Sequence, residues 1–146
     1  MSLAHGVLMP GFSGRTPPHW IAAAAHTGLA GVVLFAENTP TTEATRALTD
    51  ALHGLRPDLL VASDEEGGDV TRLYYDVGSP YPGNALLGRV DDLAWTVRVA
   101  ERVGRAVAAA GATLVLGPVA DVNANPDNPV IGVRSFGADP DLVARH

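Results

Sequence analysis

The densest group of chemically capable side chains is the segment Asp64–Arg72, where four carboxylates and one arginine fall within nine positions. Gly67 and Gly68 interrupt the segment and allow the backbone to turn tightly or to approach a ligand. Carboxylates in such a loop can accept hydrogen bonds from ligand hydroxyls, transfer protons or bind a metal. A solvated acidic loop is the alternative, and spacing alone does not decide between the two interpretations.

A second candidate lies in the segment Val133–Gly137, where an arginine precedes an aromatic residue. The fixed fork of donors on Arg134 can clamp a polar ligand. The alternative is a surface arginine whose aliphatic stem packs on Phe136. The segment by itself favours this second interpretation.

Asp121, Asn123 and Asn125 have the spacing of the first ligands in a calcium loop. The pattern fails because Pro126 stands where a calcium loop needs glycine, and Gly132 where it needs a bidentate glutamate. The chain has no cysteine, and its five histidines are scattered. We therefore predict neither a metal site nor a cofactor from these residues.

The elements that position these side chains are predicted from apolar runs and helical spacing. Continuous apolar runs, typical of strands buried on both faces, occupy Gly6–Met9, Gly31–Phe35, Leu59–Ala62 and Ala112–Leu116. Helices are predicted at Trp20–Thr27, at Thr41–Leu55, at Asp91–Ala110 and from Asp139 onwards. In the third of these helices we expect a buried stripe of Leu93, Val97, Ala100, Val103 and Val107.

Alternating strands and helices predict an α/β fold with a parallel sheet covered by helices. Both a doubly wound open sheet and a (β/α)₈ barrel fit this order. Long loops at Asp64–Val90 and Gly117–Ala138 follow the third and fourth predicted strands, at the edge where either fold binds its ligand. A complete barrel takes about 250 residues, so residues 1–146 are predicted to be a single partial domain, roughly the first half of a barrel.

The amino-acid composition disfavours some classes of binding partner. The chain has 10 arginines and no lysine against 16 acidic residues, a net charge of −6 that disfavours nucleic acid. The lack of lysine excludes a Schiff base formed by this chain. No apolar run is long enough to span a membrane. The segment Met1–Phe12 lacks the pattern of a signal peptide. We therefore expect a cytoplasmic protein, with a secreted full-length form left open.

Two motifs carry a family resemblance. The first has Asp64, Glu66, Gly67, Gly68, Val70 and Arg72 at the fixed places of D-x-E-G-G-x-V-x-R. The second runs from Leu116 through Val122, matching L-x-P-V-x-D-V, and continues as Asn128–Gly137, with the sequence NPVIGVRSFG. Together they resemble the N-terminal barrel domain of glycoside hydrolase family 3, in its β-N-acetylhexosaminidase branch.

The resemblance implies retaining hydrolysis of terminal β-linked sugars, with β-N-acetylglucosaminides as the expected substrates. Such hydrolysis needs a carboxylate nucleophile and a proton donor on opposite sides of the scissile bond. In the family, the nucleophilic aspartate, a histidine that handles the proton and a Lys-His pair all lie further along the barrel than His146. We therefore predict that the chain contains no catalytic residue and is inactive alone.

What carries over is the sugar-binding half of the family's site. The resemblance implies that Asp64, Arg72 and Arg134 bind the hydroxyls of the glycone, the sugar unit that is released. Structural support of the loops is expected from Glu66, Gly67, Gly68 and Asp121, with Glu66 and Asp121 bracing them through backbone hydrogen bonds.

Two further hypotheses stay open. One is a non-catalytic half-barrel that binds sugar and self-associates through its incomplete barrel, since exposed sheet edges and apolar surface favour pairing. The other is a divalent-metal site at Asp64, Glu65, Glu66 and Asp69.

Overall fold

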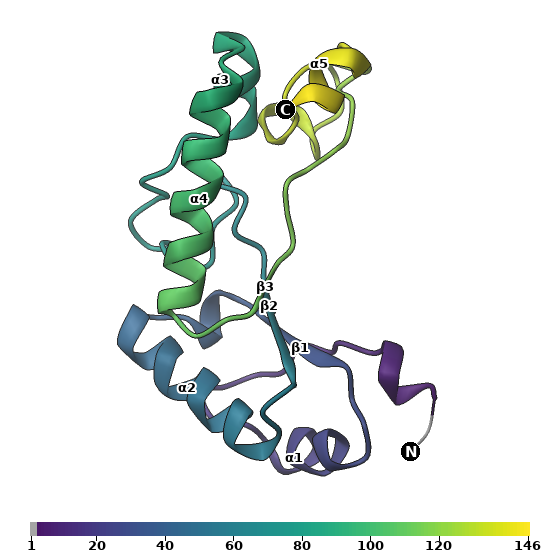
Figure 1. Cartoon of the computed structure of the whole chain (residues 1–146), viewed down its shortest axis with the longest axis vertical. Helices are drawn as coiled ribbons and strands as arrows, with labels where there is room; N and C mark the ends of the chain where they lie inside the picture. Colours follow the sequence, from purple (N-terminus) through teal and green to yellow (C-terminus); the bar gives the residue numbers. More distant parts are fainter. Residues whose placement is uncertain (1–2) are drawn as a thin grey trace.

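The computed structural model describes residues 3–146 and shows a parallel sheet with helices around it (Figure 1). The sheet has the order β1-β2-β3, with strands β1 (Gly31–Leu34), β2 (Leu60–Ser63) and β3 (Leu114–Val115). The α-helices are α1 (His19–His26), α2 (Thr42–Leu55), α3 (Asn84–Val90), α4 (Leu93–Ala109) and α5 (Pro140–Arg145). Short 3₁₀ helices are η1 (His5–Val7), η2 (Ala36–Asn38) and η3 (Gly132–Arg134). This arrangement confirms the predicted α/β class of a partial barrel.

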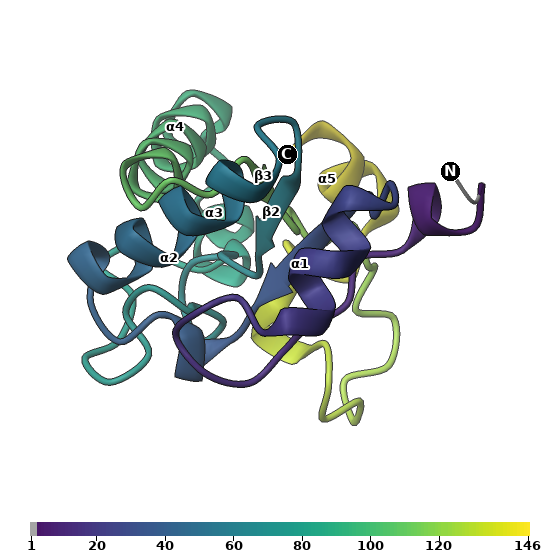
Figure 2. The ribbon, with the colours of Figure 1, turned by 90° about the horizontal axis from the view of Figure 1, so that it is seen from below.

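Figures 1 and 2 show how the helices are distributed along the molecule. Helices α1 and α2 lie at one end, beside the strands, whereas α3 and α5 lie at the other end. Helix α4 runs between the two ends and returns the chain to β3. Among residues 3–146, none of the helices is both long and apolar enough to cross a membrane.

The sheet has two unlike faces, because successive side chains of a strand alternate between them. On one face, which we call the helix face, Val32, Leu34 and Val61 are buried in a core with side chains of α1, α2 and α4. The opposite face, which we call the inner face, includes Leu60, and this side chain is 42% exposed. On this inner face, Leu60 is thus exposed near the start of β2, whereas Ala62 is buried.

A second core joins the C-terminal part of the chain to α3 and α4. It contains Leu87, Val99, Val103, Phe136 and Val143. Helix α3 approaches the backbone of Phe136 so closely that a Cβ atom on Gly88 would lie 1.8 Å from the Phe136 carbonyl oxygen. Glycine at this position is therefore a condition for packing α3 against the segment that carries Arg134.

The strand predicted at Gly6–Met9 is wrong. Residues 5–7 form η1, although the chain that follows does run beside β1: Gly31 N–H donates to the Leu8 carbonyl and Val33 N–H to the Pro10 carbonyl. A parallel ladder would also need a bond to the Gly31 carbonyl from the N–H of residue 10, and proline has none.

Two other expectations are corrected. Helix α3 lies inside the segment predicted as a long loop. On α4, three of the five residues expected in the buried stripe, Leu93, Val97 and Ala100, are exposed. The buried positions of α4 are Thr96, Val99, Val103 and Val107, which form a stripe at the same helical spacing but centred on a neighbouring side of the helix.

Candidate functional site

Asp64 directly follows β2 and therefore lies at the carboxyl end of that strand. Its Oδ2 atom accepts a hydrogen bond of 2.8 Å from Nη2 of Arg72, and about a quarter of each side chain is exposed. The Thr39 hydroxyl, from the segment after β1, donates to the carbonyl of Arg72 at 2.8 Å. The Asp64–Arg72 pair is thus held by the ends of two adjacent strands.

Glu65 holds the loop that returns Arg72 to Asp64. Glu65 is only 1% exposed. Its carboxylate accepts hydrogen bonds from the Thr71 hydroxyl, from the N–H of Arg72 at 2.9 Å and from the N–H of Leu73 at 3.1 Å. A buried carboxylate with three donors satisfies groups that would otherwise be desolvated without partners. The sequence motif emphasises Asp64 and Glu66 instead. The signal that could have found Glu65 is strand alternation, which predicts that it points to the same face as Val61 and Ser63.

Glu66 forms a second pair, with Arg134 from the loop after β3. The pair is bidentate, with Nε to Oε2 at 3.0 Å and Nη2 to Oε1 at 2.8 Å, and the Glu66 side chain is only 6% exposed. Two parallel charge-assisted bonds fix the orientation of both groups. The structure therefore places Glu66 against a side chain, and not against the backbone groups that we expected.

Electrostatics keep Arg134 charged. The hydrogen bonds from Arg134 to Glu66 raise the pKa of the guanidinium, whereas burial lowers it. The negative charges of Glu66, Asp121 and Asp64 add to the rise in the pKa. Arg134 therefore lies within the electrostatic reach of Asp64 as well as in direct contact with Glu66.

Several backbone contacts position the Arg134 segment. Asn84 Nδ2, at the start of α3, donates to the Arg134 carbonyl at 2.8 Å. The hydroxyl of the buried Ser135 lies within hydrogen-bonding distance of the Asp121 carbonyl. The Asp121 side chain itself is exposed and forms no hydrogen bond with the rest of residues 3–146. Asp121 therefore contributes its backbone carbonyl, not its carboxylate, to the loop.

Gly67 and Gly68 form the turn between the two pairs. Both have left-handed backbone angles, with φ of +81° and +58°. A Cβ atom would lie 2.8 Å from the Pro82 carbonyl oxygen at Gly67, and 2.8 Å from the Cα of Gly83 at Gly68. Other residues would therefore strain the turn and displace the segment before α3.

Of the three predicted sugar-binding residues, Asp64 and Arg72 contact each other, whereas Arg134 contacts Glu66 and is linked to Asp64 only through the charge of that carboxylate. We call Asp64, Arg72, Glu66 and Arg134 the strand-end cluster. The aromatic packing suggested as an alternative for Arg134 is not seen, because Phe136 is buried in the second core and stacks on His146. The Nε atom of Arg72 is buried and has no hydrogen-bond partner among the described residues.

Three of the four acidic residues proposed as metal ligands are engaged elsewhere, and the fourth, Asp69, is exposed. Asp64 and Glu66 pair with arginines, and Glu65 binds the backbone of its own loop. Within residues 3–146, no three histidine, aspartate or glutamate side chains come together as a metal site would require. The divalent-metal hypothesis therefore has no geometric support.

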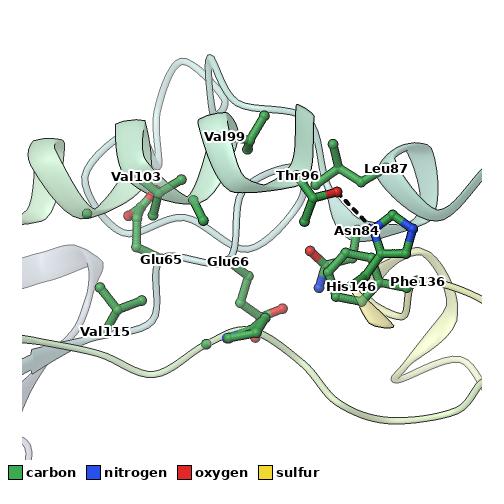
Figure 3. Close-up of a pocket in the computed structure, with 14 residues that line it drawn as sticks. Glu65, Glu66, Asn84, Leu87, Thr96, Val99, Val103, Val115, Phe136 and His146 are labelled. Atoms are coloured by element: carbon green, nitrogen blue, oxygen red, sulfur yellow. Dashed lines mark hydrogen bonds between the residues drawn. The ribbon is translucent and has the colours of Figure 1, made fainter. Parts of the chain in front are cut away.

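Two cavities adjoin the strand-end cluster. One, of about 210 Å³, has α4 along one side and Phe136 and His146 at one end, and Glu65 and Glu66 are among its lining residues (Figure 3). The other, of about 360 Å³, is lined by Arg134 together with Gly67 and Gly68. Asp64 and Arg72 do not line either of these two cavities.

This combination of a partial parallel barrel and a charged strand-end motif belongs to a known class of proteins. The model of the glycosyl hydrolase family 3 N-terminal domain matches residues 15–146, and the chain is a member of that family. The family predicted from the two motifs is thereby confirmed.

Similar proteins are named as hexosaminidases. The chain is 32% identical over 139 residues to beta-hexosaminidase A of Pseudoalteromonas piscicida, covering 88% of the chain and 23% of that protein. It is 36% identical over 117 residues to beta-hexosaminidase LpqI of Mycobacterium tuberculosis, covering 80% and 30%. The chain therefore spans less than a third of these two relatives.

Solved structures show the same similarity. A family 3 β-N-acetylglucosaminidase of a Paenibacillus species superposes with a TM-score of 0.88 at 32% identity, over 99% of this chain and 29% of that one. NagZ of Neisseria gonorrhoeae superposes with a TM-score of 0.82 at 27% identity, over 94% and 42%.

Proposed function

We propose that this chain is the glycone-binding part of a glycosidase that removes terminal β-linked N-acetylhexosamines. The observation that carries the proposal is the strand-end cluster, in which two carboxylates that follow β2, Asp64 and Glu66, are each paired with an arginine. The names of the similar proteins, beta-hexosaminidases and β-N-acetylglucosaminidases, support the choice of sugar.

The cluster suits vicinal hydroxyls. A sugar hydroxyl can donate to a carboxylate oxygen of Asp64 while a neighbouring hydroxyl accepts from a guanidinium, and both bonds are charge-assisted. Because each arginine is already oriented by its carboxylate, little side-chain entropy is lost when the ligand binds.

Binding is tested by titrating the 146-residue chain with N-acetylglucosamine and following backbone amide signals by NMR. We expect saturable shifts that concentrate in residues 64–73 and 132–136. A titration that leaves those signals unchanged up to the highest practical concentration contradicts the proposal.

Catalysis is proposed for the whole enzyme and not for this chain. Retaining hydrolysis requires a nucleophile and a proton donor, and the family resemblance places both beyond His146. A chromogenic N-acetyl-β-glucosaminide should therefore be cleaved by the full-length gene product but not by residues 1–146. Robust cleavage by the isolated chain would show that the chemistry lies in a different place.

A second function, self-association of a half-barrel, is supported by the inner face. Leu60 is exposed there, Leu116 is 39% exposed just after β3, and β3 is an edge strand. Apolar surface beside an open edge favours pairing. Light scattering tests this candidate, because a monomer at high concentration contradicts it.

A cytoplasmic location also stays a prediction, which cell fractionation would test.

A further inference from the structure

We propose that Phe35 is an aromatic platform on which the sugar ring stacks, beside Asp64 and Arg72. This inference rests on the proposed function and adds a residue to the same site. The sheet register supports this position, because Leu34 pairs with Ser63 and the residues that directly follow the two strands are Phe35 and Asp64. When the strand alternation is extended by one residue, both fall on the side of the inner face.

Phe35 is also in contact with the arginine of the cluster. The Cζ atom of Arg72 lies 5.8 Å from the centroid of the Phe35 ring, within the range of a cation–π contact. The guanidinium that pairs with Asp64 therefore also stands over the ring. An aromatic surface, a carboxylate and a guanidinium are thus adjacent at the ends of β1 and β2.

The ring is exposed although its surroundings are rigid. Phe35 is 44% exposed. Its N–H donates at 2.8 Å to the side chain of the buried Asn38, which in turn donates to the carbonyls of Phe12 and Gly14. A Cβ atom on Gly11 would lie 2.6 Å from Cε2 of Phe35, so the N-terminal segment passes directly against the ring. A large apolar side chain fixed in this way beside a carboxylate and a guanidinium offers a preformed surface to a ligand.

A pyranose fits that surface. One side of the sugar ring presents C–H groups, which are apolar and carry partial positive charge, while its hydroxyls project around the rim. The C–H side can pack on the negative face of an aromatic ring and be removed from water. Hydroxyls at the rim would then meet Asp64 and Arg72. The ligand class is therefore a pyranose with an unobstructed C–H face, as in N-acetylglucosamine.

The test uses the 146-residue chain and N-acetylglucosamine. In the wild-type chain, intermolecular NOEs should connect the ring protons of Phe35 to C–H protons of the sugar. Phe35→Leu should weaken binding by roughly fivefold to tenfold through the loss of stacking. Phe35→Trp should retain it. Trp20→Leu, which removes an exposed aromatic from α1, is the matched control and should leave the affinity unchanged.

The outcomes separate the two proposals. Binding by the wild-type chain without NOEs from Phe35, or with equal affinity in Phe35→Leu, overturns the platform and leaves the proposed function intact. No binding by the wild-type chain overturns the proposed function, and the platform with it. The NOE measurement needs no variant, so it decides the matter even if Phe35→Leu fails to fold.

Discussion

The molecule contains two clusters in which arginines pair with carboxylates at similar distances, but the two clusters differ in how deeply the carboxylates are buried. In the strand-end cluster, Arg72 and Arg134 pair with Asp64 and Glu66 at 2.8 Å. A second group, which we call the C-terminal cluster, consists of Asp91, Arg145 and His146. Asp91 accepts from Arg145 at 2.7 Å and lies 3.1 Å from His146 Nε2.

Burial makes the two clusters energetically unlike. Glu66 is almost fully buried, so removing its partner leaves a desolvated charge, which is costly. Asp91 is exposed, and ion pairs at the surface contribute little. Packing, and not charge, anchors α5: the His146 ring stacks on Phe136 with centroids 5.0 Å apart, and its Nδ1 lies 2.8 Å from the Thr96 hydroxyl.

Helix α3 connects the two clusters. Asn84 at its start binds the Arg134 carbonyl, and Asp91 caps its end in a left-handed conformation with φ of +53°. The largest expected effect therefore comes from moving α3. Gly88→Ala should destabilise the fold by at least about 3 kcal/mol, because the new Cβ would overlap the Phe136 carbonyl.

The matched control for that variant is Gly104→Ala on α4, where a Cβ meets nothing within 4 Å. This change should stabilise the chain by about 0.5 to 1 kcal/mol, through higher helix propensity. Urea unfolding measures both variants. Equal stability of the two would show that α3 does not need its close approach to Phe136.

Removing the buried carboxylate of Glu65 should have the next largest effect. Glu65→Ala leaves the Thr71 hydroxyl and the N–H groups of Arg72 and Leu73 without an acceptor, at a cost of about 2 to 3 kcal/mol. Glu101→Ala, which breaks an exposed pair with Arg105, should cost less than about 0.5 kcal/mol. Similar losses in the two variants would contradict the role given to Glu65.

A conservative change at each cluster sharpens the contrast. Arg134→Lys cannot reproduce the bidentate contact with Glu66 and should destabilise the chain by about 1 to 2 kcal/mol. Arg145→Lys should produce little change, since its partner is exposed. Thermal unfolding of both variants compares them directly, and a greater loss in Arg145→Lys would reverse the ranking of the clusters.

The smallest effect is expected from pH. Hydrogen bonds from Arg145, and secondly from His146, lower the pKa of Asp91. A lowered pKa stabilises the fold above the unfolded value of about 3.9, and this contribution is lost as the pH falls through the lowered pKa. The wild-type chain should therefore lose slightly more stability than Asp91→Asn on acidification below about pH 4. Identical losses of stability in the two proteins, measured by urea unfolding at several pH values, would show that the ionisation of Asp91 does not contribute to stability.

Part of the fold could be predicted because local patterns were strong. The apolar runs that became β1 and β2 were clear, and Gly28 and Gly111 end their helices with positive φ, of +100° and +80°. Helix α3 was missed because its seven residues follow a stretch rich in glycine and proline. The stripe of α4 was misplaced because the polar Thr96 takes a buried position and bonds to His146.

The site was predictable in its residue types but not in its pairing. The motifs identified Asp64, Glu66, Arg72 and Arg134, yet nothing local to the sequence says that Glu66 and Arg134, 68 residues apart, share two hydrogen bonds. That contact depends on how the loops after β2 and β3 fold toward each other. The burial of Glu65 likewise depends on hydrogen bonds that its carboxylate accepts from the Thr71 hydroxyl and the Leu73 N–H, six and eight residues further along the chain.

The central claim is that Asp64, Arg72 and Arg134 jointly hold one sugar. The most direct measurement is the affinity of N-acetylglucosamine, by NMR titration, for the wild-type chain and for Asp64→Asn, Arg72→Lys and Arg134→Lys, with Arg98→Lys on the exposed side of α4 as control. We predict that each of the three variants binds at least about tenfold more weakly, a loss of about 1.4 kcal/mol, while the control is unaffected. Wild-type affinity in all three folded variants would contradict the account.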